Sequence, residues 1–331
     1  MRGRVAQGRC GVQVWRTMSG GPIRVLVQLR KDLAERVASA VPDVASVVVP
    51  WEGDLPPDAA GEVLLTLPWA SPNLTQVLTR GVRWVHTLGT GIDRFPLELL
   101  GDRLLTCSRG ASAVPIAEWV LAVMLAFEKR LPDAWIHAAP AGGWSRMVLG
   151  GLHGRTLGLV GLGGIGTAVA RRALPFGMRV LACRRTATPS EVAGVELVAS
   201  LATLVAASDH VVIAAPSTPA TRHLLGREVF SVIKPGAHLV NVARGALVDQ
   251  DALRAALDDG RVAMASLDAV EPEPLPEGHW MFAHPGVRLS PHISWSMPGA
   301  IDLLLDSFID NLRRWRAGEP LTGVVDRGAE Y

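Results

Sequence analysis

The feature that most constrains this chain is a glycine-rich turn between an apolar strand and a helix. Residues 157–166 read Leu-Gly-Leu-Val-Gly-Leu-Gly-Gly-Ile-Gly, so Gly161, Gly163 and Gly166 make the pattern G-x-G-x-x-G. The first glycine permits a tight turn, the second lets the backbone approach a diphosphate, and the third lets the helix pack on the strand. The helix start then offers free N–H groups and the positive end of its dipole. Gly-rich turns are common, but this one has a strand before it, a helix after it and a second strand at 178–183, which favours a dinucleotide site.

The residues at the end of that second strand indicate which dinucleotide binds. An NAD-binding unit has an Asp or Glu about 20 residues past the glycines, which holds the ribose 2′-hydroxyl. Here Arg184 and Arg185 stand instead, beginning 18 residues after Gly166, with no acidic residue beside them. Two guanidinium groups can bind a 2′-phosphate, although a solvated arginine pair on a loop gives the same pattern. We therefore expect NADP as the cofactor, with NAD as the less favoured choice.

Short apolar runs alternate with amphipathic stretches along the chain, which predicts an α/β fold with parallel sheets. The strands expected before the glycine turn are residues 23–29, 44–49, 63–67, 84–87 and 104–106, and the helices between them are 32–40 and 73–79. The later strands are 156–160, 179–183, 210–214, 238–242, 263–267 and 287–289. These six strands match a complete doubly wound dinucleotide fold. Two longer helices are expected at 112–131 and 297–317.

The composition narrows the class of protein. The chain has 331 residues, of which 49% are hydrophobic and 19% charged, and this fits two globular, soluble domains. A net charge of +2 from scattered basic residues offers no surface for nucleic acid. The longest apolar run, 119–127, is too short to cross a bilayer, and the three distant cysteines suggest neither disulfides nor a zinc site. We expect a cytoplasmic protein without a metal, in which residues 1–18 form a disordered N-terminal extension.

Four segments carry a resemblance to a known family. They are residues 154–166 around the glycine turn, 215–224 (Ala-Pro-Ser-Thr-Pro-Ala-Thr-Arg-His-Leu), 241–253 (Asn-Val-Ala-Arg-Gly-Ala-Leu-Val-Asp-Gln-Asp-Ala-Leu), and 267–274 (Leu-Asp-Ala-Val-Glu-Pro-Glu-Pro) with Ser-Pro-His-Ile at 290–293. Through them most of the chain resembles the D-isomer-specific 2-hydroxyacid dehydrogenases. The resemblance implies a Rossmann nucleotide domain, 112–295, inserted into a flavodoxin-like substrate domain, 19–111 and 296–331. The active site would lie in the cleft between them.

Reduction of a 2-oxo acid needs a hydride, a proton for the carbonyl oxygen and a cation for the carboxylate, and the resemblance supplies residues for the last two. Arg244 would bind the carboxylate, because its planar fork matches two oxygens and stays charged. A loop arginine that pairs with Asp249 or Asp251 would look the same in the sequence. The proton donor would be His292, in a Pro-His turn after a strand.

The carboxylate that keeps His292 protonated and fixes its ring is expected to be Glu273. Two acidic-Pro steps follow one another, so Glu271 is an alternative. In the family pattern the catalytic Glu lies five residues after the Asp at the end of the strand. That Asp is Asp268 here, so the family pattern selects Glu273. Asp268 itself would accept a hydrogen bond from the nicotinamide carboxamide. The nearest alternatives to His292 as the proton donor are His86 and His279.

The resemblance also implies binding residues. The loop 88–93 is similar to the family's substrate loop. In that loop Thr90 and Gly91 would bind the substrate carboxylate, together with Arg244 and His292. An ordinary glycine turn would have the same sequence pattern. Trp69 and Trp295 are candidates for the pocket wall or for packing at the domain boundary. The expected cofactor residues are Gly161, Gly163, Gly164, Ile165, Gly166, Arg184, Arg185, Pro216, Thr221, Ala243 and Asp268.

These features predict an NADPH-dependent reductase of a small 2-oxo acid, of the glyoxylate or hydroxypyruvate type, that yields a D-2-hydroxy acid. A dinucleotide-sensing binding protein, as in the family's transcriptional corepressor branch, stays open, as does a formate or phosphite dehydrogenase on the same fold. The resemblance further implies a homodimer through the nucleotide domains. Trp119, Val123, Phe127 and Trp135 could line that interface, or could pack in the chain's own core.

Overall fold

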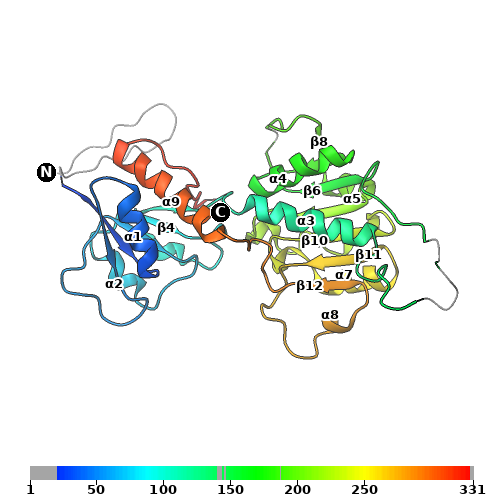
Figure 1. Cartoon of the computed structure of the whole chain (residues 1–331), viewed down its shortest axis with the longest axis horizontal. Coiled ribbons are helices and arrows are strands. Elements are labelled where there is room, and N and C mark those ends of the chain that lie inside the picture. Colours follow the sequence, from blue (N-terminus) through cyan, green and yellow to red (C-terminus); the bar gives the residue numbers. More distant parts are fainter. Residues whose placement is uncertain (1–20, 140–143, 145–146, 187, 329–331) are drawn as a thin grey trace. The chain divides into compact units, whose positions relative to one another are not determined.

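The computed structural model describes residues 21–139, 144, 147–186 and 188–328. The N-terminal extension expected at residues 1–18 lies outside the described residues. The chain divides after Ser112 and after Pro298 into two compact units, each built around one parallel sheet (Figure 1). Unit 1 runs to Ser112 and resumes at Gly299, whereas unit 2 is the continuous segment Ala113–Pro298. The α/β class with two parallel sheets, predicted from the sequence, is confirmed.

Unit 1 contains a five-stranded sheet in the order β2-β1-β3-β4-β5. Its strands are β1 (Ile23–Val27), β2 (Val44–Val48), β3 (Val63–Thr66), β4 (Trp84–Thr87) and β5 (Leu104–Cys107). Val25 and Val27 pack on the face covered by α1 (Lys31–Ala40) and α9 (Ala300–Ala317). Leu26 packs on the opposite face, with α2 (Leu74–Leu78). Because successive side chains in a strand point to opposite faces, an unbroken apolar strand needs cover on both sides.

Unit 2 contains a seven-stranded sheet in the order β12-β11-β10-β9-β6-β7-β8. The strands are β6 (Thr156–Val160), β7 (Arg179–Cys183), β8 (Val195–Leu197), β9 (His210–Ile213), β10 (Ala237–Asn241), β11 (Val262–Leu267) and β12 (Val287–Leu289). The sequence predicted six of them and missed β8. This strand has only three residues, two of them exposed, so it shows no apolar run, and it forms by pairing with β7 at the sheet edge.

Helices cover both faces of the sheet in unit 2. On one face α3 (Ala113–Glu128) and α4 (Gly164–Ala173) pack on Leu157 and Leu159 of β6, and Figure 1 shows these two helices next to each other. The opposite face packs against α5, α6, α7 and α8. Their bounds are α5 (Leu201–Ala207), α6 (Arg227–Val232), α7 (Gln250–Asp258) and α8 (Trp280–Ala283).

The two longest helices are shorter than the sequence predicted. The first ends at Glu128 and not at residue 131, because Arg130 has a φ of 52° and Pro132 follows. The last begins at Ala300 and not at residue 297. Pro298 disfavours the helical conformation in the residue before it, and Gly299 has a φ of 80°.

The parallel sheet of unit 2 brings distant parts of the sequence to one edge. The glycine turn follows β6, Arg184 follows β7, Arg244 follows β10 and Asp268 follows β11. All these strands are parallel, so the segments after them lie along the same edge. Ligands of open α/β sheets bind at this edge.

Candidate active site

The glycine turn has the geometry that its three glycines require. Gly161 has a φ of 98°, and a Cβ there would lie 2.8 Å from the carbonyl oxygen of Ala214 at the end of β9. A Cβ on Gly166 would lie 2.4 Å from the carbonyl oxygen of Gly161, so the helix packs directly on the turn. At Gly163 a Cβ would meet nothing within 4 Å. The first and third glycines are therefore required by the fold, whereas the second leaves open space.

The helix that follows presents an uncapped N-terminus. Helix α4 begins at Gly164, and no side chain of the N-cap residue Gly163 can bond its first N–H groups. Ile165 is half-buried and packs against the apolar layer under α3 and α4. The chain thus supplies backbone donors and a positive dipole end, which is the donor set that binds a diphosphate.

The two arginines expected at the cofactor lie directly after β7, next to the glycine turn in the sheet. Arg184 is half-buried, and its Nη2 donates to the carbonyl oxygen of Pro189 at 3.0 Å. Its Nε is buried and has no hydrogen-bond partner among the described residues. Arg185 is exposed.

The loop after β9 uses its own polar groups to hold its shape. The Thr221 hydroxyl donates to the carbonyl oxygen of Pro216 at 2.8 Å and accepts from the Thr218 N–H at 2.8 Å. Pro216 is exposed. Thr221, which the sequence assigned to the cofactor, therefore fixes the loop conformation.

Arg244 lies in a turn that a buried asparagine organises. The side chain of Asn241 accepts from the Ala243 N–H at 3.0 Å and donates to the Arg244 carbonyl oxygen at 2.9 Å. Arg244 is half-buried, and its Nη1 donates to the Ala243 carbonyl oxygen at 2.9 Å. The Asp249 side chain caps α7, where it accepts from the N–H groups of Asp251 and Ala252. Sequence reasoning did not single out Asn241, although an Asn at the buried end of a strand was a visible signal.

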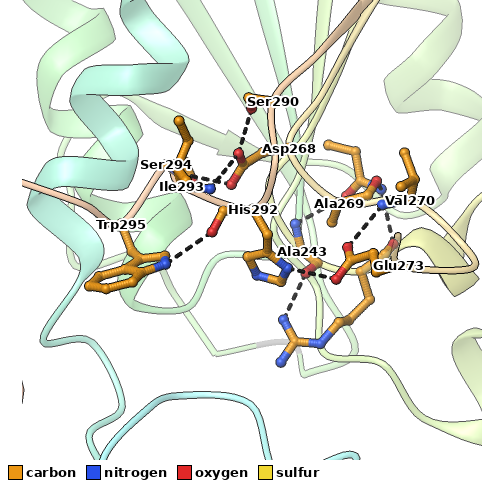
Figure 2. A network of polar contacts seen from close by, with 12 residues as sticks. Ala243, Asp268, Ala269, Val270, Glu273, Ser290, His292, Ile293, Ser294 and Trp295 are labelled. Carbon is orange, nitrogen blue, oxygen red and sulfur yellow. Dashed lines mark hydrogen bonds and ion pairs between the residues drawn. The ribbon is translucent and has the colours of Figure 1, made fainter. Parts of the chain in front are cut away.

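His292 and Glu273 form the central contact of the site. Figure 2 shows the imidazole ring and the carboxylate turned toward one another, with His292 Nδ1 3.0 Å from Glu273 Oε2. The other oxygen, Oε1, accepts from the Val270 N–H at 3.1 Å. Burial raises the pKa of Glu273, but the hydrogen bond and charge of His292, with smaller contributions from Val270 and Arg244, hold it below its ordinary value. The carboxylate is therefore charged at neutral pH, beside the ring of His292.

The alternative carboxylate points to a different partner. Glu271 Oε1 accepts from Arg222 Nη1 at 3.0 Å, and both side chains are well exposed. Of the two consecutive Glu-Pro steps, the first therefore pairs Glu271 with a surface arginine, and the second pairs Glu273 with His292. The structure therefore pairs His292 with Glu273.

Asp268, which the sequence assigned to the nicotinamide, accepts hydrogen bonds from the segment that carries His292. It is 2% exposed, and Oδ1 accepts from the Ser290 hydroxyl and from the Ile293 N–H at 2.8 Å. Oδ2 accepts from the Ser294 N–H at 2.9 Å (Figure 2). Each of its oxygens therefore accepts a hydrogen bond from the segment that carries His292. Sequence reasoning did not predict these contacts.

The backbone of His292 is held in a rarely populated conformation. Its φ is 56°, which an L-residue adopts only when its surroundings impose it. The Trp295 indole N–H donates to the His292 carbonyl oxygen at 3.0 Å, and the Trp295 ring packs against the core of unit 2. Trp295 therefore supports the backbone conformation of His292.

The candidate substrate loop belongs to unit 1. Thr90 is exposed at the end of β4, and its hydroxyl donates to the Ser108 carbonyl oxygen at 3.3 Å. Gly91 beside it is half-buried. Trp69, in the same unit, is 49% exposed and forms a backbone bridge with Arg94.

The two rival histidines have structural roles. His86 is fully buried in unit 1, where its ring nitrogens contact Thr106 at 2.7 Å and Ser108 at 3.1 Å, and burial lowers its pKa to about 3. His279 Nδ1 accepts from the Met281 N–H at the start of α8. Neither ring is placed as a proton donor.

Comparison with known proteins identifies the family of this chain. The family model described as "D-isomer specific 2-hydroxyacid dehydrogenase, NAD binding domain" matches residues 121–294, more than half of the chain. The chain belongs to the D-isomer-specific 2-hydroxyacid dehydrogenase family. It is therefore an oxidoreductase with a nicotinamide dinucleotide-binding Rossmann domain.

Relatives in this dehydrogenase family differ in their named substrates. A glyoxylate reductase/hydroxypyruvate reductase of Homo sapiens is 34% identical over 72% of this chain and 75% of its own length. A D-3-phosphoglycerate dehydrogenase of Methanocaldococcus jannaschii is 36% identical over 72% of this chain, but this chain spans only about half (46%) of it. A D-isomer-specific 2-hydroxyacid dehydrogenase of Xanthobacter autotrophicus Py2, crystallised with NADPH and MES, has a TM-score of 0.81 at 28% identity. That similarity covers 94% of this chain and the whole of the other.

Two further kinds of site are absent from the part of the chain that the structure describes. No helix there has the length and apolar character needed to cross a membrane. No group of three or more His, Cys, Asp or Glu side chains among those residues is arranged to hold a metal ion.

Proposed function

We propose that this dehydrogenase reduces a small 2-oxo acid to a D-2-hydroxy acid with NADPH. The observation that carries the proposal is the contact between His292 and Glu273, on the sheet edge where Arg244 and the glycine turn also lie. A charged carboxylate beside an imidazole and a nearby guanidinium provide a proton donor and a carboxylate-binding cation. This pair of groups is what the reduction of a 2-oxo acid needs from the protein.

The residues at the glycine turn fit a dinucleotide. The open space at Gly163 lets backbone and diphosphate approach, and the uncapped N-terminus of α4 supplies donors. Gly161, Gly164, Ile165 and Gly166 complete the turn that would hold the diphosphate. The remaining expected cofactor contacts are Pro216, Thr221, Ala243 and Asp268. When bound, NADPH supplies the hydride.

The chain's own residues would handle the substrate carboxylate and the proton. The Arg244 guanidinium would hold the carboxylate of the 2-oxo acid, and backbone N–H groups at Thr90 and Gly91 would also bind it. His292 would give its proton to the carbonyl oxygen from Nε2, because Nδ1 faces Glu273. Glu273 would stabilise the protonated ring before transfer and take no proton itself.

The substrate class is tested by NADPH oxidation with a panel of 2-oxo acids. Because glyoxylate and hydroxypyruvate appear in the names of relatives that are 34–39% identical, we expect the highest kcat/KM for one of these two. Tight NADPH binding without turnover of any 2-oxo acid would refute a reductase and favour a dinucleotide sensor. Reduction of NADP by formate or phosphite would favour the other alternative.

The choice of NADPH rests on Arg184 and Arg185. The buried Nε of Arg184 lacks a partner among the described residues, which suits an anionic group arriving at that position. Each charged hydrogen bond to a phosphate is worth about 1.5–3 kcal/mol, so loss of both arginines should shift preference by roughly 10²-fold or more. The measurement is kcat/KM for NADPH and NADH in the wild type and in an Arg184→Asp, Arg185→Ala double variant. A wild type that uses both cofactors equally well would contradict this choice.

We also propose a homodimer, and of the four residues that the sequence suggested for its interface, Trp135 is the exposed one. Trp119 and Val123 pack against the core of unit 2, and Phe127 stacks on His238 at 4.6 Å between ring centroids. The segment that follows α3 instead exposes large apolar side chains, with Trp135 at 63% and Val148 at 94%. Such exposed groups mark protein interfaces. Light scattering should give the mass of two chains at micromolar concentration, and a single-chain mass would refute the dimer.

A further inference from the structure

We propose that Asn241 is a positioning residue that sets the spacing between Arg244 and Glu273. The inference rests on the proposed function, which gives those two residues their roles. Asn241 is the last residue of β10 and is 1% exposed. It lies opposite Leu267 of the neighbouring strand β11, so its side chain stands where the two catalytic loops begin.

The amide of Asn241 ties these two loops together. Its Oδ1 accepts from the Ala243 N–H at 3.0 Å, and its Nδ2 donates to the Arg244 carbonyl oxygen at 2.9 Å. The same Nδ2 also donates to the carbonyl oxygen of Ala269, on the other loop, at 3.2 Å. An amide offers one acceptor and two donors in this small volume, and all of them are used here.

A second contact makes the two loops move as one. A Cβ on Gly245 would lie 2.0 Å from the carbonyl carbon of Val270, so the backbone after Arg244 rests directly on the other loop. The N–H of that same Val270 donates to Glu273 Oε1 at 3.1 Å. A shift of the turn after Asn241 would therefore displace both the cation and the carboxylate that orients His292.

Unit 1 offers a matched control. Asn311 in α9 is also fully buried, and its amide also makes three hydrogen bonds, all to Thr322. It donates to the Thr322 carbonyl oxygen at 2.9 Å and accepts from its N–H at 2.8 Å and its hydroxyl at 3.0 Å. Removal of either amide leaves three hydrogen-bonding groups without their partner, and the three at Asn311 all belong to Thr322, which is not assigned to the reaction.

The experiment compares Asn241→Ala and Asn241→Asp with Asn311→Ala, using the 2-oxo acid that the wild type reduces best. The Asp variant keeps the size and one acceptor but turns an oxygen toward two carbonyl oxygens. We expect kcat/KM to fall on the order of 10²-fold in both Asn241 variants, because displacements of about 1 Å have effects of that size. Part of the fall in kcat/KM should come from a higher KM. A smaller fraction of folded enzyme would lower the apparent kcat but would leave KM unchanged. Asn311→Ala should also lose thermal stability but keep the wild-type kcat/KM.

The outcomes separate this inference from the proposed function. Wild-type kcat/KM in Asn241→Ala, with a melting temperature lowered as in Asn311→Ala, overturns the positioning role; if the alanine variant does not fold, Asn241→Asp is judged by the same criterion. Absence of activity in the wild type overturns the proposed function instead. If the wild type is inactive, crystal structures of the wild type and Asn241→Asp test the positioning role. Displaced side chains of Arg244 and Glu273 in the variant support it, and unmoved side chains overturn it.

Discussion

At the scale of single residues, the site depends on how one carboxylate divides its two oxygens. Glu273 gives one oxygen to the His292 ring and the other to the Val270 N–H. The backbone bond orients the carboxylate, so the ring is aligned by a group that cannot rotate freely. The net lowering of the Glu273 pKa shows that these contacts outweigh the effect of burial.

Replacement of His292 tests the proton donor. General acid catalysis contributes about 10²–10⁴-fold, so His292→Ala should lower kcat for reduction by that order. NADPH affinity should stay unchanged, because His292 is assigned to the substrate and not to the cofactor. Stopped-flow or steady-state kinetics with direct binding measurements provide both quantities. Full activity in the variant would exclude the mechanism.

Replacement of Glu273 tests the source of the charge. Glu273→Gln keeps a hydrogen-bonding group but removes the charge that favours the protonated ring. The ring then loses its proton at lower pH, so the falling limb of reductive activity should move to lower pH. The pH profile of kcat/KM measures this shift. Glu271→Gln is the matched control, since Glu271 pairs with Arg222, and its profile should match the wild type.

At the scale of elements, the glycines of the strand-to-helix turn differ in whether folding or cofactor binding requires them. A side chain at Gly161 would face both a φ of 98° and the Ala214 carbonyl oxygen. Gly163 has a φ of −90° and open space around it. Folding therefore requires the first glycine but does not require the second.

This difference predicts opposite results for two alanine variants. Gly163→Ala should melt as the wild type does, within about 0.5 kcal/mol, yet bind NADPH at least roughly tenfold more weakly, because the methyl group occupies the space for the diphosphate. Gly161→Ala should lose about 1–3 kcal/mol or more of stability. Thermal melting and NADPH titration measure both effects. Unchanged NADPH affinity in Gly163→Ala would place the diphosphate elsewhere.

At the scale of the whole molecule, each unit contains histidines that burial keeps neutral. His86 in unit 1 has a pKa of about 3, and His210 in unit 2 has a pKa of about 4. The pKa of His238, which contacts His210, is also well below its ordinary value because of burial. In the unfolded chain these rings bind protons below about pH 6.5, whereas in the folded chain they do not. Stability is therefore present above that pH and falls as the pH decreases toward 4.

A variant at His86 measures this effect for unit 1. As the pH falls from 7 to 5, the unfolded chain takes up most of a proton at this residue and the folded chain takes up none, which costs about 2 kcal/mol of stability. His86→Gln removes the titration, so its loss of unfolding free energy over that interval should be smaller than that of the wild type by about that amount. Urea denaturation at the two pH values measures both. An equal pH dependence in the two proteins would show that the His86 ring is protonated in the folded state.

The sequence by itself determined the features that depend on local chemistry. The glycine pattern specifies a turn because only glycine tolerates the φ of Gly161, and the apolar runs specify strands because both faces of the sheets are buried. Most strand bounds were predicted within one or two residues for that reason. The strand β8 was missed because its three residues form a strand only by pairing with β7.

The tertiary structure decided which side chains meet. Glu271 and Glu273 are equivalent in local sequence, and the family pattern selected Glu273. The neighbouring positions of β11 and β12 are what bring it beside His292, 19 residues further along. The same strand pairing brings Asp268 to the backbone at 293–294, a contact that the sequence did not indicate. Strand β10 likewise brings Asn241 to two loops at once. Contacts between segments far apart in sequence depend on sheet order, which the local residue pattern does not contain.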